Sequence, residues 1–248
     1  MGAANEVVFD PSKESAHILH RSRYSEANFK IIGCVFDPQL RMLDAAKHIA
    51  REAGWRLKTL LRTRKFFTTL EIGHLYKAQI LYYMESSTAA LYHAAPTNLA
   101  WIDRVQHRFL REIGLSELEA LKDFRLAPLK CRRDMAMLGV LHNINLGGAP
   151  SQLQALAQEL PGRRRLRFWR PLHSKQLATP VDGASSEVLK RSLFGLVHCY
   201  NKLPQKLVDA TTVKALQRDL QLGLLHCAEL GLGNLHLLFS TGWKELPR

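Results

Sequence analysis

Residues 43–60, LDAAKHIAREAGWRLKTL, decide the class of fold. Apolar side chains recur in this stretch at intervals of three and four, at Leu43, Ala46, Ala50, Ala53, Leu57 and Leu60. Because an α-helix turns once every 3.6 residues, that spacing places them on one side of a helix. The stretch therefore predicts an amphipathic helix whose apolar side faces a core.

The polar side of this predicted helix is strongly basic. Between Arg41 and Lys65 the chain carries eight Lys and Arg residues against two acids, Asp44 and Glu52. A cationic face of this kind suits the phosphates of a nucleic acid, and a merely solvated helix face is the alternative. The residues that we expect to line a duplex-facing side are Arg51, Arg56, Lys58 and Arg62.

Start and stop signals divide the following chain into further helices. Thr68 with Glu71, and Ser116 with Glu119, have the spacing of capping boxes, which predicts a helix after each pair. A helix from Thr68 to about residue 92 and a short helix after Ser116 follow from them. The other predicted helices span about 97–113, 128–146, 151–160, 186–203 and 212–230, several of them bounded by Gly or Pro.

The first forty residues have a different pattern. Val7–Phe9 and Cys34–Phe36 are short β-prone runs, each followed by an Asp-Pro pair, and Phe29–Ile32 is another such run. We expect a hairpin-rich patch here, too small to stand alone and more typical of the margin of a sheet.

Composition narrows the class of partner. The chain has 248 residues, 46% of them hydrophobic, as in globular proteins, and 35 Lys and Arg against 22 acids give a net charge of +13. An excess of this size favours a polyanionic partner. No segment reaches the length of an apolar membrane span, and residues 1–6 match neither a signal peptide nor a myristoylation motif. We therefore expect an intracellular protein, in nucleus or cytoplasm, that is neither secreted nor bound to a membrane.

Motifs that would build a catalytic centre are missing from the sequence. The four cysteines are far apart and form no Cys-x-x-Cys pair, which predicts reduced, buried thiols and no zinc site. Asp10 and Asp37 each precede a proline, so they are expected to form turns rather than to bind metal. No Gly-rich phosphate loop or nucleophile motif is present. We predict no catalytic residue and no cofactor in this chain.

Two further basic clusters are candidates for nucleic-acid binding. In the polar stretch 163–185, arginine side chains are expected to grip phosphates and an aromatic to stack on an unpaired base, the residues being Arg163, Arg164, Arg165, Arg167 and Trp169. The alternative is a basic loop whose aromatics anchor it to the core. Arg132 and Arg133 fall in the first turns of a predicted helix, where cations oppose the helix dipole. Either Asp134 or a phosphate is expected to offset them.

Four segments resemble the reverse transcriptases of non-LTR (LINE-type) retrotransposons. Phe29-Lys30-Ile31-Ile32-Gly33, with Val35-Phe36-Asp37 and Leu40, is similar to the segment F-K-x-L-G-v-x-x-D-x-x-L at the palm edge of that family. Residues 8–14 resemble the preceding palm motif, which ends in a lysine. Residues 126–147 resemble a helix that begins L-x-x-L-x-x-R-R, and residues 200–220 resemble a C-terminal segment of the type W/Y-N-x-L-P.

The resemblance implies an organisation and places two lysines. It implies a mainly α protein with a palm-edge remnant at 1–37, a helical thumb-like region at 38–115, a helical connection at 116–162, a basic arm or linker at 163–185 and a helical extension at 186–248. Lys13 and Lys30 would then lie nearest the polymerase centre.

The chain departs from the family at the catalytic aspartates. In that family they lie in palm strands that would precede Met1, and no Asp-Asp pair occurs here. We therefore expect a truncated, reverse-transcriptase-like protein that does not polymerise, Mg²⁺ being expected only for a full-length polymerase. It would hold template–primer duplex or RNA without reading sequence, with the missing palm and fingers as a further partner. The alternative is a basic helical interaction protein, a domesticated element fragment, that binds an acidic protein.

Overall fold

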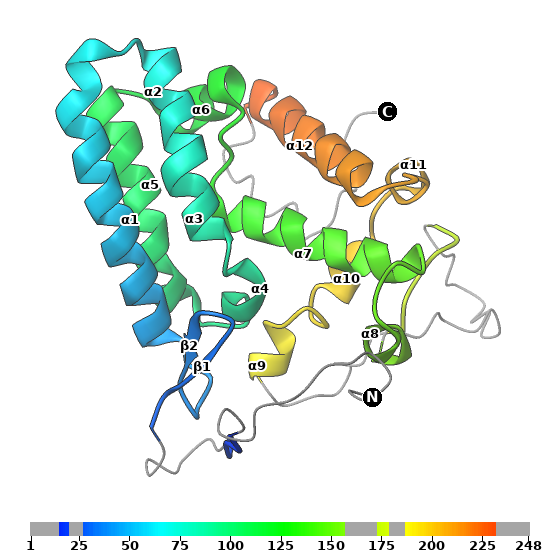
Figure 1. The fold of residues 1–248 in the computed structure, drawn as a ribbon. Coiled ribbons are helices and arrows are strands. Elements are labelled where there is room, and N and C mark those ends of the chain that lie inside the picture. Colours follow the sequence, from blue (N-terminus) through cyan, green and yellow to red (C-terminus); the bar gives the residue numbers. More distant parts are fainter. Residues whose placement is uncertain (1–14, 20–26, 157–172, 179–186, 232–248) are drawn as a thin grey trace, which may run out of the picture.

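The computed structural model describes residues 15–19, 27–156, 173–178 and 187–231. These residues form a mainly helical protein with one two-stranded antiparallel hairpin near the N-terminus (Figure 1). The fold class predicted from the sequence is thereby confirmed. Within the described ranges, no helix combines the length and the apolar character that crossing a membrane requires.

The hairpin consists of β1 (Phe29–Ile31) and β2 (Cys34–Phe36). Phe29 lies opposite Phe36, and the two rings stack with centroids 5.6 Å apart. The turn residues Ile32 and Gly33 both have positive φ, 46° and 82°, which matches the twist of a tight hairpin. Such a φ is unusual for a β-branched residue, and Ile32 is fully exposed.

Asp37, directly after β2, shapes the entry into the helical part. Its carboxylate accepts hydrogen bonds from the backbone N–H groups of Gln39, Arg41 and Met42, at 3.1, 3.0 and 2.6 Å. The expectation that Asp37 forms a turn is confirmed.

The longest helix, α1 (Leu43–Thr63), packs along α5 (Pro96–Ile113), and the pair forms one side of the molecule (Figure 1). The apolar stripe of α1 is buried, as predicted, at Ala46, Ala53 and Leu57 among others. The predicted start of this helix near residue 97 is one position too late. The helix begins instead at Pro96, whose missing N–H suits the first helical position, and it ends at Gly114 (φ 74°) as predicted.

Between α1 and α5, residues 69–85 form one continuous helical rod. A short 3₁₀ turn, η3 (Arg64–Phe66), leads to α2 (Thr69–Tyr76), which opens with the predicted capping box of Thr68 and Glu71. A π turn, η4 (Lys77–Leu81), joins α2 to α3 (Tyr82–Glu85). The predicted single helix to residue 92 is interrupted after Glu85, and α4 (Thr88–Leu91) follows.

Two hydrophobic clusters form the core. The first joins α1, α2, η4, α3 and α5, and the Tyr76 ring stacks on Phe109 at 3.8 Å within it. The second is built around α7 and α12. Its elements are α6 (Glu117–Phe124), α7 (Leu129–Asn145), α8 (Ser151–Leu156), α10 (Val197–Tyr200), α11 (Gln205–Val208) and α12 (Val213–Glu229). The short helix α9 (Glu187–Lys190) precedes α10 and contributes no buried residue.

Helix α7 carries the second cluster, and α12 lies against it (Figure 1). The two helices lie close together at Gly139, where an added Cβ would lie 2.6 Å from Gln217 Nε2 and 2.9 Å from Val213 Cγ1. Thr212 caps α12 by accepting a hydrogen bond from the N–H of Ala215, at the predicted start. The helix predicted over 186–203 is instead split into α9 and α10 with turns between them.

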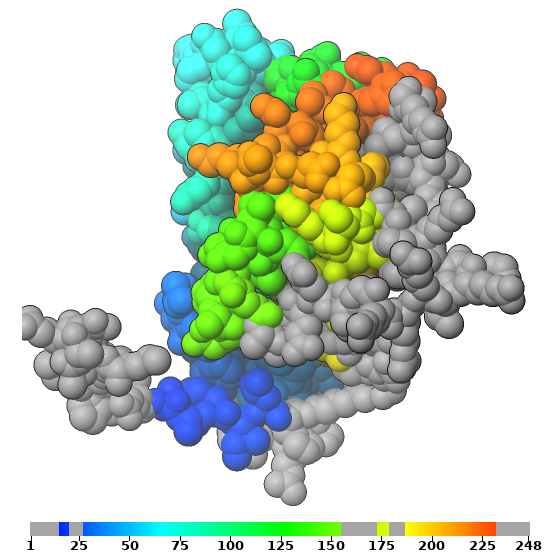
Figure 2. All heavy atoms as spheres, turned by 90° about the vertical axis from the view of Figure 1, so that its right-hand side faces the viewer, coloured from blue at the N-terminus to red at the C-terminus, as the bar shows by residue number. Residues whose placement is uncertain are grey.

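Residues 173–178 complete this second cluster although they lie far from α7 and α10 in the sequence. In Figure 2 they form a compact patch between the end of α7 and the chain around α11. Asn145 Nδ2 donates to the Lys175 carbonyl at 3.0 Å, and the Asn201 amide donates to and accepts from the backbone of Leu177. The segment is thus held by polar contacts from both sides.

Candidate nucleic-acid interface

An open groove of about 450 Å³ runs between α1 and α5. Because the two helices pack through their apolar sides, the adjoining flanks of each helix form its walls. The lining residues are Lys47, Ala50, Arg51, Gly54, Leu57, Trp101, Arg104, Val105 and Arg108. Four of these nine residues are cations and none is an acid, so the groove is a concentrated positive surface.

Trp101 organises two of these cations. Its indole, 40% exposed, lies 5.6 Å from Lys47 Nζ on α1 and 4.6 Å from Arg104 Cζ on its own helix, each distance measured to the ring centroid. Both are cation–π distances, so the ring holds a cation from each wall of the groove in a defined place. The charged heads stay exposed, which leaves their donors available to an anion.

Within the part of the chain that the structure describes, three of the four groove cations lack a carboxylate partner. No ion pair is formed by Lys47, Arg104 or Arg108 there. Arg51 lies 3.6 Å from Glu52 of the same helix, and both side chains are largely exposed, so this pair neutralises little. Like charges in one groove repel each other, and a bound anion would relieve that repulsion.

The predicted residues of α1 do not share one face. Arg51, Lys58 and Arg62 are exposed and lie within about 40° of each other around the helix, given 100° per residue. Arg56 is rotated about 140° from Arg51. Its guanidinium donates to the Gln79 carbonyl at 3.1 Å and stacks on Tyr83 at 3.9 Å. Arg56 thus fastens α1 to η4 and α3, away from the groove.

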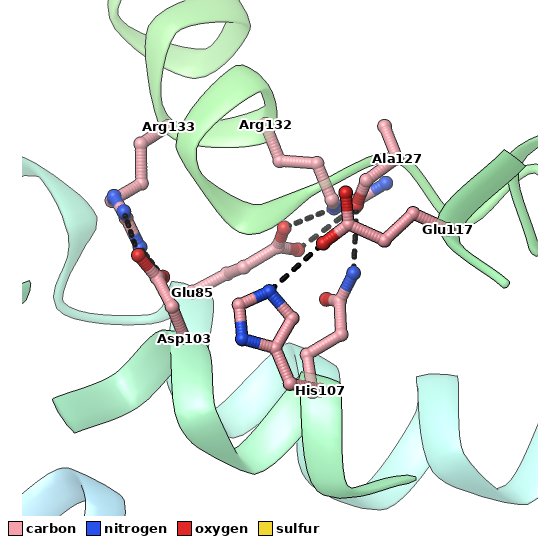
Figure 3. Close-up of polar contacts among 8 residues, drawn as sticks. Glu85, Asp103, His107, Glu117, Ala127, Arg132 and Arg133 are labelled. Atoms are coloured by element: carbon pink, nitrogen blue, oxygen red, sulfur yellow. Dashed lines mark hydrogen bonds and ion pairs between the residues drawn. The ribbon is translucent and has the colours of Figure 1, made fainter. Parts of the chain in front are cut away.

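Arg132 and Arg133 make internal ion pairs (Figure 3). Arg133, 7% exposed, donates two hydrogen bonds to Asp103, from Nη1 at 2.7 Å and Nη2 at 3.0 Å. Arg132 contacts Glu85 in the same two-point manner, with Nη2 2.9 Å from Oε2. Glu85 of α3 and Asp103 of α5 are therefore the carboxylates that pair with these two cations, where the sequence predicted Asp134 or a phosphate.

The same junction holds α5, α6 and α7 together (Figure 3). His107 Nε2 lies 2.8 Å from a Glu117 carboxylate oxygen, and Gln106 Nε2 donates to the Ala127 carbonyl at 3.1 Å. This frame fixes the position of α5, and with it the wall of the groove that carries Arg104 and Arg108.

The remaining predicted residues fall in two groups. Lys30 is exposed on β1, in a hairpin that packs against the start of α1. Lys13, Arg163, Arg164, Arg165, Arg167 and Trp169 lie outside the described residues. The groove thus contains one of the predicted residues, Arg51, with Lys58 and Arg62 on the adjoining exposed side of α1.

Sequence reasoning missed Trp101, Arg104 and Arg108. Their signal was present, because intervals of three and four place all three on the polar side of α5. In the sequence, the nearby acids Asp103 and Glu112 partly offset the positive charge of that helix. In the folded protein Asp103 points to Arg133 instead.

The described residues show no catalytic constellation. Among them, no group of three His, Cys, Asp or Glu side chains is placed to hold a metal ion. All four cysteines are buried and free, as predicted, and burial raises the pKa of Cys131 and Cys199 to about 12. Such thiols stay protonated at neutral pH and are weak nucleophiles.

The buried histidines have structural partners. His142 Nε2 donates to the Ala210 carbonyl at 2.8 Å and its Nδ1 accepts from the Tyr200 hydroxyl at 3.0 Å. His173 Nε2 donates to the Tyr200 carbonyl at 3.0 Å. Desolvation lowers the pKa of both imidazoles, so they stay neutral near pH 7.

No family model matches this sequence, and the comparisons with curated proteins and with solved structures likewise returned no match.

Proposed function

We propose that this protein binds nucleic-acid duplex by its phosphate backbone, through the groove between α1 and α5. The observation that carries the proposal is the set of four groove cations, Lys47, Arg51, Arg104 and Arg108, lined up beside Trp101 without an acid among the lining residues. Lys and Arg side chains are hydrogen-bond donors only, and they match phosphate oxygens in charge and geometry.

The type of contact argues against sequence readout. The groove lies between two exposed helix flanks and offers no helix end or loop that would enter a major groove. Its cations repeat along α5 at an interval of four residues, so they can follow a row of phosphates. The resemblance to reverse transcriptases suggests that the preferred duplex is an RNA–DNA hybrid or RNA, held without polymerase chemistry. The relationship of the chain to reverse transcriptases is itself part of the proposal.

The test measures binding of a labelled RNA–DNA hybrid of mixed sequence by fluorescence anisotropy at several salt concentrations. We expect measurable affinity at low salt that falls steeply as salt rises, because each neutralised phosphate releases a counterion and makes the negative slope of log K against log salt steeper by about 0.9. Unrelated sequences should bind equally well.

The groove is tested with Arg104→Glu/Arg108→Glu. Both side chains are exposed, so the fold should survive, and we expect affinity to fall at least tenfold with a salt slope lower by about 2. The matched control, Lys130→Glu/Lys206→Glu, changes two exposed cations outside the groove by the same charge. If both double variants lose affinity equally, net charge and not the groove is responsible.

The alternative partner is an acidic protein surface, which the same cations would suit. Absence of duplex binding at low salt, or binding that is insensitive to salt, would refute the nucleic-acid proposal and leave this alternative.

A further inference from the structure

A second cationic site lies on the other side of α3 from the α1–α5 groove. Two adjoining hollows of about 420 and 360 Å³ share Glu85, Arg132 and Gln221 as lining residues. Both volumes are in the range of small-molecule sites. Together they form a recess where α3 and η4 of the first core cluster meet α7 and α12 of the second.

Each of three helical segments contributes one stripe of side chains to this recess. Lys77, Leu81 and Glu85 recur every four residues along the η4–α3 segment, and Arg132, Met135 and Ala136 lie on one side of α7. From α12 come Lys214, Gln217, Arg218 and Gln221, at the spacing of one helix face. Gly139 allows α12 to approach α7 closely enough to bring its stripe into the recess.

The charge of the recess is unbalanced. Its cations are Lys77, Arg125, Arg132, Lys214 and Arg218, and Glu85 is the only acid among the lining residues of both hollows. Glu85 is already paired with Arg132, and Arg218 lies 3.2 Å from Asp219 on its own helix. Burial and the charge of Arg132 lower the pKa of Lys77, so the surroundings of this ammonium group disfavour its charged form.

Arg125 lines the recess, and its backbone is held in place there by α12. It ends α6 with a left-handed backbone, φ 54°, which is uncommon for a residue other than glycine. Its carbonyl accepts a hydrogen bond from Gln221 Nε2 at 2.9 Å, so α12 fixes the position from which the exposed guanidinium reaches the recess. The neutral amides of Gln217 and Gln221 add donors beside the cations.

We propose that this recess binds a small anion with a chain of two or more phosphates, such as inorganic triphosphate or the phosphate tail of a nucleotide. The two connected hollows fit a short chain of phosphates, with cations on opposite walls to clamp it. Tyr82, 74% exposed at the rim, is placed to stack on a nucleobase. The site is separate from the α1–α5 groove and does not depend on its proposed function.

The experiment uses the whole chain and isothermal titration calorimetry with sodium triphosphate and, separately, ATP, both without added metal. We expect both to bind and to raise Tm, because the ligand bridges elements of the two core clusters. Tighter binding of ATP than of triphosphate would support stacking of the base on Tyr82, and equal binding would assign the affinity to the phosphates. Binding of neither anion overturns the proposal.

Lys214→Ala/Arg218→Ala tests the recess itself. Both side chains are exposed on α12 and alanine is a good helix former, so the variant should fold and lose at least tenfold in affinity for triphosphate. The control pair, Lys130→Ala/Lys206→Ala, removes the same charge elsewhere and should bind like the unmodified protein. An equal loss in the control, or unchanged binding in the Lys214/Arg218 variant, overturns the proposal.

Two further measurements separate this recess from the duplex groove. Arg104→Glu/Arg108→Glu should retain triphosphate binding even where it loses duplex, and its failure to do so would assign the anion to the groove. A chain that binds an oligonucleotide but neither triphosphate nor ATP would also contradict the proposal.

Discussion

In the α1–α5 groove, Arg104 and Arg108 are exposed and form no ion pair with a carboxylate among the described residues. Arg132 and Arg133 on α7, in contrast, each form an ion pair with a carboxylate. The four side chains have the same chemistry, and their surroundings differ. A paired arginine that is buried or partly buried contributes to the fold, while an unpaired and exposed one contributes attraction for an anion. Basic residues therefore become informative about function only once their partners are known.

The largest expected effect concerns the paired side of this contrast. Arg133→Ala should lower the free energy of unfolding by about 3 kcal/mol, because it leaves Asp103 half-buried without its two donors. Urea denaturation followed by circular dichroism measures this loss. Asp103→Leu with Arg133→Met should recover much of it, since an apolar pair leaves no unpaired charge. Duplex binding at low temperature should not change. A large loss of affinity there would show that a paired arginine also contributes to binding.

Lowering the pH tests the second core cluster. The pKa values of His142 and His173 are lowered in the folded protein, so the unfolded chain takes up protons first as the pH falls below about 6.5, and stability falls with it. The effect should be smaller than that of Arg133→Ala, because both rings keep a hydrogen bond to a carbonyl. His142→Gln should weaken the dependence on pH between 7 and 5. An unchanged dependence would assign it to other groups.

Arg56→Ala and Arg51→Ala compare an arginine that joins α1 to other elements with one whose polar contacts, to His48 and Glu52, stay within α1. Loss of the Arg56 contacts with Gln79 and Tyr83 should lower stability by about 1 kcal/mol and leave the salt slope of duplex binding unchanged. Arg51→Ala should do the reverse, lowering the slope by about 0.9 at constant stability. Thermal unfolding and anisotropy measured on both variants decide. Equal effects of the two would remove the distinction.

Filling the groove without changing its charge gives the smallest expected change in stability. A Cβ at Gly54 meets no atom within 4 Å, so a side chain can start there without a clash. Gly54→Leu should raise stability by about 0.5–1 kcal/mol because glycine is a poor helix former. The leucine side chain would occupy the groove, so duplex affinity should fall even though the protein is more stable. Gly54→Ala is the control, with a similar gain in stability and little loss of affinity.

Local signals in the sequence predicted much of this fold. The capping boxes at Thr68 and Ser116, the glycine end at Gly114 and the start of the last helix at residue 212 lie where they were expected, because each depends on residues within a few positions. The π turn at 77–81 and the division of the 186–203 segment were not predicted. Helical periodicity carries no information about either feature.

The candidate site was less predictable for a related reason. Glu85 is 47 residues from Arg132, and Asp103 is 30 residues from Arg133. A single sequence does not reveal which helices will pack together, so it did not reveal which cations would be paired. The groove required the additional knowledge that α1 lies beside α5, which brings Lys47 next to Trp101.

The π turn η4 makes the number of residues in this segment important for the structure. A π turn contains one residue more than the α-helical turn that it replaces. Deleting one residue within 77–81 would restore a regular helix and rotate the preceding segment by about 100° relative to Tyr82–Glu85. Lys77 would then leave the recess, and Tyr76 would leave its stack on Phe109. In this short segment, the number of residues therefore matters more to the structure than which residues they are.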